Sequence, residues 1–126
     1  MKRVAILESN LMWSARLARS VAALGYEAVM LEDGVRLPPG FDVAILDLSR
    51  LPEPAAAYID DLHGSGVVTI GHAGHKEHEL MDLGRNSGCR ILATNREMTT
   101  RLGALIAEAL ALKEGLCDSA SGKNSV

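Results

Sequence analysis

The sequence predicts an α/β domain built on a doubly wound, five-stranded parallel sheet. Short apolar runs without polar alternation recur along the chain, which is typical of strands buried on both faces of a parallel sheet. Segments with helical periodicity separate most of these runs, and strand–helix alternation of this kind places helices on both faces of one sheet. The 126 residues suffice for one such domain and are too few for two.

The five expected strands share a continuous apolar or β-branched character. They cover residues 4–7, 26–31, 41–47, 67–70 and 89–93. Glu8 directly follows the first of these runs, and Asp47 ends the third. A carboxylate is therefore expected at the end of each of these two strands.

The expected helices lie between the strands or after the last one. They cover residues 11–24, 53–62, 76–83 and 95–113. Asn10 and Asn95 stand where an N-cap accepts a backbone hydrogen bond, and Gly25 stands at a C-terminal stop. Residues 32–40 contain two prolines and two glycines, so we expect the helix between the second and third strands to be shortened or absent.

The domain is expected to span residues 1–113. Beyond Gly115 the chain is composed mainly of small and polar residues. We therefore expect residues 114–126 to form a flexible C-terminal tail.

Composition excludes several classes of function. Thirteen Lys and Arg against sixteen Asp and Glu give a formal charge of −3, which argues against direct binding to nucleic acid through phosphate contacts. Two cysteines are too few for a disulfide scaffold and suit a reducing compartment. Because no apolar run approaches the ~20 residues of a membrane span, we expect a cytoplasmic protein without membrane contact.

Polar and small residues follow four of the expected strands, at the sheet edge where doubly wound folds bind ligands. These residues are Glu8 and Ser9, Asp47, Gly71 and His72, and Thr94 and Asn95. Glu8 and Asp47 are expected to converge there, and paired carboxylates can hold Mg²⁺. The plainer interpretation is that each carboxylate is merely solvated.

At this point the chain resembles the receiver domain of bacterial two-component response regulators, over residues 2 to about 112. The resemblance rests on five short segments in the family's order and spacing. They are Val4-Ala5-Ile6-Leu7-Glu8-Ser9, Leu24-Gly25-Tyr26, Asp33-Gly34, Asp42-Val43-Ala44-Ile45-Leu46-Asp47 and Ser87-Gly88-Cys89. Membership would imply a flavodoxin-like fold and a role in a phosphorelay.

The resemblance also implies roles for the residues at the strand ends. In the family, two acids after the first strand and an Asp after the third bind Mg²⁺, and that Asp accepts a phosphoryl group from a histidine kinase. Asp47 matches the phosphoacceptor and Glu8 the first acid, whereas Ser9 stands in place of the second acid. The family's Thr or Ser after the fourth strand corresponds to Gly71. Its Lys after the fifth corresponds to Asn95, or to Thr94 in a shifted register, and Arg96 replaces the Pro that follows.

These departures favour an atypical single-domain receiver over a standard phospho-switch. Phosphoryl transfer depends on positioning and on cations that neutralise developing charge. Here a metal carboxylate, the ammonium and the hydroxyl are all replaced, so we expect Mg²⁺ to be weakly bound or absent and phosphoryl chemistry at Asp47 to be weakened or lost. Arg96 could supply a substitute cation. The expected role is non-enzymatic protein–protein interaction.

The expected partner is a histidine kinase or a downstream target. In receivers, partners and dimer mates dock on the surface formed by the fourth helix, the fifth strand and the fifth helix. That surface corresponds here to residues 76–83, 89–93 and the last helix. A homodimer through it is a second possibility that the resemblance implies.

Two alternatives stay open. The first is a true phosphoaccepting receiver that uses Asp47 and Mg²⁺. The second is a small metal- or cofactor-binding flavodoxin-like protein, for which His72, His75 and His78 could supply imidazole ligands if their segment is partly a loop. Exposed loop histidines are the plainer interpretation, although His72 could also lie beside Asp47 and respond to its charge.

Overall fold

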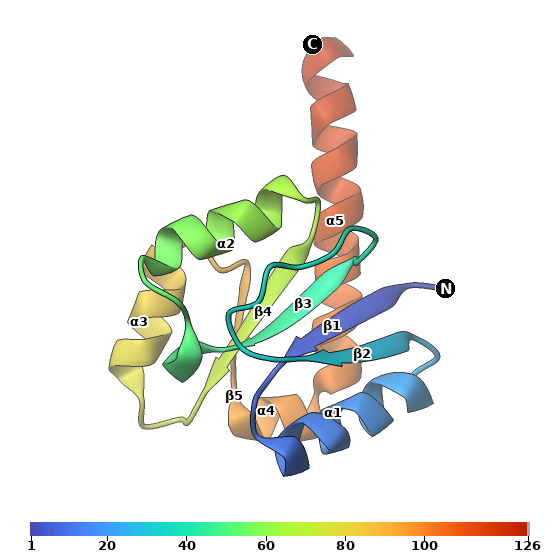
Figure 1. Ribbon diagram of the computed structural model, residues 1–126. Helices are drawn as coiled ribbons and strands as arrows, with labels where there is room; N and C mark the ends of the chain where they lie inside the picture. Colours follow the sequence, from blue (N-terminus) through green and yellow to red (C-terminus); the bar gives the residue numbers. More distant parts are fainter. Residues whose placement is uncertain (126) are drawn as a thin grey trace.

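The structure, a computed structural model, describes residues 1–125. Within that range five parallel strands form one sheet in the order β2-β1-β3-β4-β5 (Figure 1). They are β1 (Arg3–Leu7), β2 (Glu27–Leu31), β3 (Val43–Asp47), β4 (Val68–Ala73) and β5 (Ile91–Thr94). This confirms the predicted flavodoxin-like sheet, in which the strand order reverses between β1 and β3.

Helices cover both faces of the sheet. They are α1 (Leu11–Ala23), the short 3₁₀ helix η1 (Leu48–Arg50), α2 (Ala55–Gly64), α3 (His78–Asn86), α4 (Asn95–Thr100) and α5 (Leu102–Ser125). Alternate residues of β1 point to opposite sides: Val4 and Ile6 pack with α1, α4 and α5, whereas Ala5 and Leu7 pack with α2. The continuous apolar strands are thereby buried on both faces, as predicted.

Local signals explain most of the boundaries. Asn10 caps α1, since its Oδ1 accepts a hydrogen bond from the backbone N–H of Trp13 at 3.0 Å. Gly25 follows the end of α1 with φ +94°, a left-handed conformation that favours glycine. Both predictions from the sequence are confirmed.

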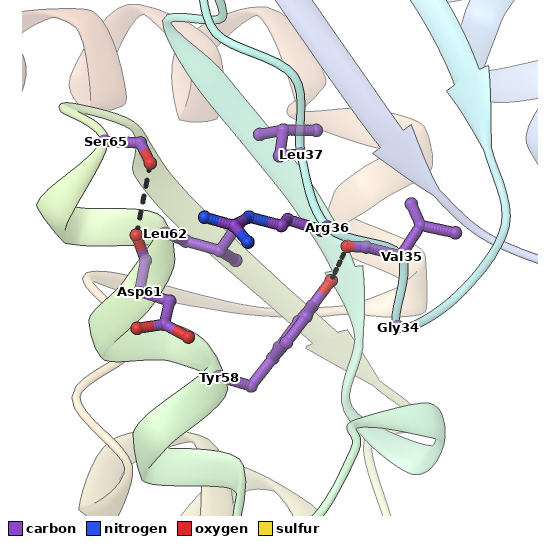
Figure 2. Close-up of a pocket in the computed structure, with 8 residues that line it drawn as sticks. All are labelled: Gly34, Val35, Arg36, Leu37, Tyr58, Asp61, Leu62 and Ser65. Atoms are coloured by element: carbon purple, nitrogen blue, oxygen red, sulfur yellow. Dashed lines mark hydrogen bonds between the residues drawn. The ribbon is translucent and has the colours of Figure 1, made fainter.

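No helix forms between β2 and β3, as the prolines and glycines of that segment predict. Instead, Leu37 and Phe41 insert into the core beside α2. The hydroxyl of Tyr58 donates to the carbonyl of Val35 at 3.0 Å and ties the loop to α2. A pocket of about 340 Å³ lies between the loop and α2 (Figure 2).

Several expectations about secondary structure are wrong. The segment expected as a loop after residue 70 continues β4 to Ala73, because β4 is buried throughout and His72 finds polar partners there. The last helix is broken at Arg101 into α4 and α5. Thr94, not Asn95, is the cap of α4, in a reciprocal capping box with Glu97.

Helix α5 extends past its expected end near Lys113, through Ser125. Residues 104–114 consist of Ala, Leu, Ile, Glu and Lys, mostly strong helix formers, and Gly115 alone does not stop the helix. Val126 lies outside the described residues. The division into a domain of residues 1–113 and a tail stays a prediction. Among the described residues, no helix combines the length and apolar character needed to cross a bilayer.

Candidate functional site

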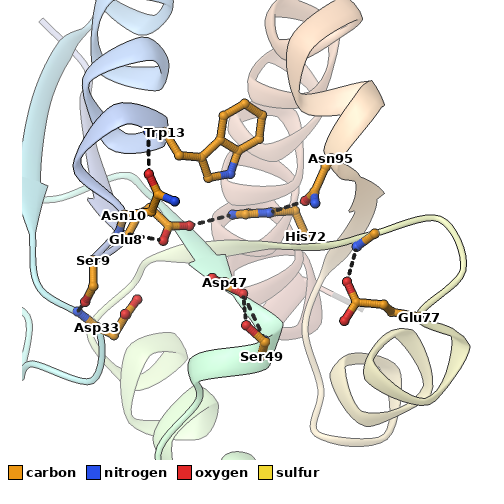
Figure 3. Close-up of polar contacts among 11 residues, drawn as sticks. Glu8, Ser9, Asn10, Trp13, Asp33, Asp47, Ser49, His72, Glu77 and Asn95 are labelled. Atoms are coloured by element: carbon orange, nitrogen blue, oxygen red, sulfur yellow. Dashed lines mark hydrogen bonds and ion pairs between the residues drawn. The ribbon is translucent and has the colours of Figure 1, made fainter.

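The candidate site lies at the carboxyl edge of the sheet, where four strand ends meet (Figure 3). β1 leads into Glu8, β3 ends at Asp47, β4 carries His72 and β5 leads into Asn95. Parallel register places Asp47 directly beside His72 on the neighbouring strand. The convergence of Glu8 and Asp47 on one edge, expected from the sequence, is confirmed.

Glu8 and His72 form the buried centre of the site. The Oε2 atom of Glu8 lies 3.5 Å from Nε2 of His72, and their side chains are only 3% and 2% exposed. The other carboxylate oxygen of Glu8 accepts a hydrogen bond from the backbone N–H of Asn10 at 3.1 Å. The expectation that Glu8 might simply be solvated, and that His72 belongs to an exposed loop, is therefore wrong.

Asn95 and Trp13 fix the ring of His72. Nδ1 of His72 lies 2.8 Å from Oδ1 of Asn95, a hydrogen-bonding distance. Trp13 packs edge-on against the ring, with centroids 6.0 Å apart and an interplanar angle of 72°. Both ring nitrogens thus face oxygen atoms, an arrangement that suits an imidazolium with two N–H donors.

The electrostatics of the pair favour the charged forms of both groups. Burial alone would raise the pKa of Glu8, but the facing ring of His72, the hydrogen bond from the Asn10 N–H and the charge of His72 lower it below its ordinary value. Burial alone would lower the pKa of His72, but the facing Glu8 carboxylate, the hydrogen bond to Asn95 and the charges of Asp47 and Glu8 raise it. The pair therefore stays carboxylate and imidazolium over a wider pH range than two isolated groups.

Asp47 remains partly exposed, but one of its oxygens is engaged. Its Oδ1 accepts from the backbone N–H of Ser49 at 3.0 Å and from the Ser49 hydroxyl at 2.7 Å. These bonds cap η1. Ser49 was not among the site residues expected from the sequence, although a hydroxyl two residues after a strand-end Asp is a recognisable turn signal.

Structural contacts involve Ser9 and Gly71, two of the positions at which the resemblance implies other residues. The Ser9 hydroxyl lies 3.5 Å from the backbone N–H of Asp33, at the limit of a hydrogen bond. A Cβ atom at Gly71 would come within 2.6 Å of the Leu48 side chain and 2.9 Å of the Cys89 sulfur, so a Ser or Thr does not fit there without displacement. Arg96 is exposed, and no ion pair in the described part of the chain joins it to Asp47.

The donor set does not fit a resident Mg²⁺. The Glu8 oxygens face His72 and the Asn10 N–H, Ser9 contributes no charge, and one Asp47 oxygen is bound to Ser49. Mg²⁺ takes oxygen ligands, so imidazole is a poor substitute. The three spaced histidines do not converge, because His72 is buried whereas His75 and His78 are exposed. No three His, Cys, Asp or Glu side chains among the described residues form a metal cluster.

Comparison with solved structures identifies the fold. A CpaE protein assigned to pilus assembly, from Burkholderia thailandensis, matches with a TM-score of 0.72 and 16% identity, over 88% of this chain and 99% of that one. A response regulator receiver protein from Burkholderia phymatum matches with a TM-score of 0.70 and 15% identity, over 88% and 96%. A CheY-like receiver domain protein from Methanospirillum hungatei matches with a TM-score of 0.70 and 17% identity, over 91% and 98%.

The chain has the receiver-domain fold. The resemblance read from the sequence is thereby confirmed at the level of the fold, over nearly the whole length of these neighbours. No family model matches the sequence, and no curated protein does.

Proposed function

We propose that this chain is an atypical receiver in bacterial signal transduction, which acts through protein–protein interaction and in which phosphoryl chemistry at Asp47 is weakened or lost. One observation supports this most directly: the Glu8 carboxylate, needed for a metal in an active receiver, is buried against His72 at 3.5 Å. Asn95 stands at the position of the family's lysine and binds His72 instead of supplying a cation. Without a metal ion and a lysine, charge developing on a transferred phosphoryl group is poorly stabilised.

The proposed partner is a histidine kinase or a downstream target protein. The surface proposed for its docking, or for a second copy of the chain, consists of α3, β5 and α4 with the start of α5. Leu83 on α3 is 40% exposed and Arg96 on α4 is exposed, so both side chains are accessible to a partner. A cytoplasmic location is part of the proposal, in keeping with the low cysteine content.

A phosphoaccepting receiver is the second candidate, and the placement of Asp47 favours it. Asp47 remains partly exposed at the end of β3, and one of its oxygens has no hydrogen bond among the described residues. A phosphoryl donor could therefore reach it. The spaced histidines give the third class, a metal- or cofactor-binding protein, no comparable support.

Phosphoryl labelling separates the two receiver functions. The protein is incubated with acetyl phosphate and Mg²⁺, and its intact mass is followed, with Asp47→Asn as the control. We expect no stable phosphoryl adduct that depends on Asp47. Stoichiometric labelling of the wild-type protein that Asp47→Asn abolishes would establish the phosphoaccepting function instead.

A further inference from the structure

The buried carboxylate of Glu8 needs a positive partner, and the structure supplies it internally. A carboxylate that is 97% buried is costly unless it is paired or bound to a metal. Among the described residues, Glu8 Oε2 and His72 Nε2 have no conventional hydrogen-bond partner, and they face one another at 3.5 Å. No lysine or arginine of the described residues forms an ion pair with Glu8 or Asp47.

The ring of His72 is held in this place from three sides. Asn95 engages Nδ1 at 2.8 Å, and Trp13 packs against the ring edge-on (Figure 3). The third constraint is β4 itself, in which His72 is paired with Asp47 on β3 and Ala93 on β5. Rotating the ring away from Glu8 would break the bond to Asn95 and expose a buried carboxylate, so the contact is built into the fold.

We propose that His72 occupies the place of the divalent cation at this site, and that its ring, held against Glu8, blocks this carboxylate from binding Mg²⁺. The proposal rests on the proposed function and deepens it, because it assigns the loss of metal dependence to a particular residue. Removing His72 should restore a metal site formed by Glu8 and Asp47. The remaining substitutions, Ser9 and Asn95, would still keep that site weaker than a standard one.

Metal titration of the wild-type protein and of His72→Ala tests the proposal. Trp13 is the only tryptophan and packs against the ring of residue 72, so its fluorescence reports on the site. At constant ionic strength and neutral pH, we expect no saturable response of the wild-type protein to MgCl₂ or MnCl₂. His72→Ala should respond saturably, with an apparent affinity at least about tenfold higher, since the metal no longer competes with the ring of His72 for the Glu8 carboxylate.

The double variant Glu8→Gln/His72→Ala is the matched control. It keeps the space created by removing the ring but lacks the carboxylate, so the metal response should be lost again. Electron paramagnetic resonance of bound Mn²⁺ provides a second readout that does not depend on tryptophan. Equal Mg²⁺ affinity of wild-type and His72→Ala proteins would overturn the proposal, as would a folded His72→Ala that binds no metal.

A measurement on the wild-type protein decides the matter if His72→Ala does not fold. Long-range ¹H–¹⁵N spectra report the protonation and surroundings of the His72 ring nitrogens. We expect these signals to stay unchanged when MgCl₂ or ZnCl₂ is added. Saturable shifts with either metal would overturn the proposal, because His72 would then be displaced by a metal or would itself be a ligand.

These results are distinguishable from those that bear on the proposed function. Metal binding by the wild-type protein without phosphoryl labelling would overturn the role of His72 and leave the atypical receiver intact. Labelling at Asp47 without detectable metal binding would overturn the atypical receiver and leave the role of His72 intact.

Discussion

Leu48 shows how a single core side chain restricts which residue can stand at position 71. It directly follows Asp47, is 1% exposed, and lies between two glycines on neighbouring elements. A Cβ atom at Gly71 would approach Leu48 Cδ2 to 2.6 Å, and one at Gly84 would approach the same atom to 2.9 Å. Core packing within β4 therefore favours glycine at position 71, where the resemblance implies a hydroxyl.

Restoring that hydroxyl should destabilise the protein. Gly71→Ser would force Leu48 and Cys89 to move within a close-packed interior, so we expect a loss of about 1–3 kcal/mol in the free energy of unfolding. Urea unfolding at neutral pH measures this loss.

Gly64→Ser is the matched control for this substitution. Gly64 ends α2, is exposed, and has no atom within 4 Å of a built Cβ. Its substitution should change the free energy of unfolding by no more than about 0.5 kcal/mol. A Gly71→Ser variant as stable as Gly64→Ser would show that the packing around Leu48 can accommodate a side chain at position 71.

At the scale of elements, α5 is tied to the sheet by a charged contact as well as by its apolar face. Nζ of Lys113 lies 2.7 Å from Oδ1 of Asp42, and the other oxygen of Asp42 accepts from the backbone N–H of Arg3 at 2.8 Å. Burial alone would raise the pKa of Asp42, but Lys113 and the Arg3 N–H lower it below its ordinary value of 3.8. The contact joins α5, β1 and the start of β3.

Removing Lys113 should give a pH-dependent loss of stability. A group with a lowered folded-state pKa stabilises the protein above its unfolded pKa, and this contribution disappears as the pH falls through the folded pKa. Both side chains are under one-third exposed, so Lys113→Met should cost roughly 1 kcal/mol between about pH 5 and 8. The difference from wild type should shrink as the pH falls below 3.8.

Urea midpoints across this pH range measure the effect. Lys76→Met, at an exposed lysine before α3, is the control and should show little difference at any pH. A wild-type-to-variant difference that stays constant into the acid range would mean that Asp42 is not the partner that matters.

At the scale of the whole molecule, the place where the domain ends within the chain stays a prediction. Leu105, Ile106 and Ala109 are the last buried residues of α5 whose side chains the structure describes, and Figure 1 shows the end of the helix projecting away from the sheet. We therefore predict that the domain does not need the part of α5 beyond Gly115.

A truncated chain ending after Gly115 should keep the stability of the full chain. We expect its thermal midpoint to lie within about 2 °C of wild type, because every described buried contact and the Lys113–Asp42 ion pair are retained. Circular dichroism measures both the midpoint and the helical signal.

A chain ending after Ala104 lacks the buried residues Leu105, Ile106 and Ala109 and should fail to fold cooperatively. A large loss of stability after removal of residues 116–126 alone would extend the domain to the end of the chain.

The sequence by itself determined the sheet, its five strands and the meeting of Glu8 and Asp47 at one edge. These follow from local apolar runs and from a topology in which parallel strands end on the same side. It also determined the missing helix after β2, since proline and glycine act through the local backbone. The face of α1 was harder to predict, because apolar Leu11 is 82% exposed whereas polar Ser14 is buried.

Only the tertiary structure decided what the site contains. His72 looked like a loop residue because glycines flank it in sequence, yet its ring nitrogens face Glu8 and Asn95, which lie 64 and 23 residues away along the chain. Thr94 rather than Asn95 became the helix cap because Asn95 already binds His72. Pairings of this kind depend on burial and on the register between strands, and a linear pattern of residue types contains neither.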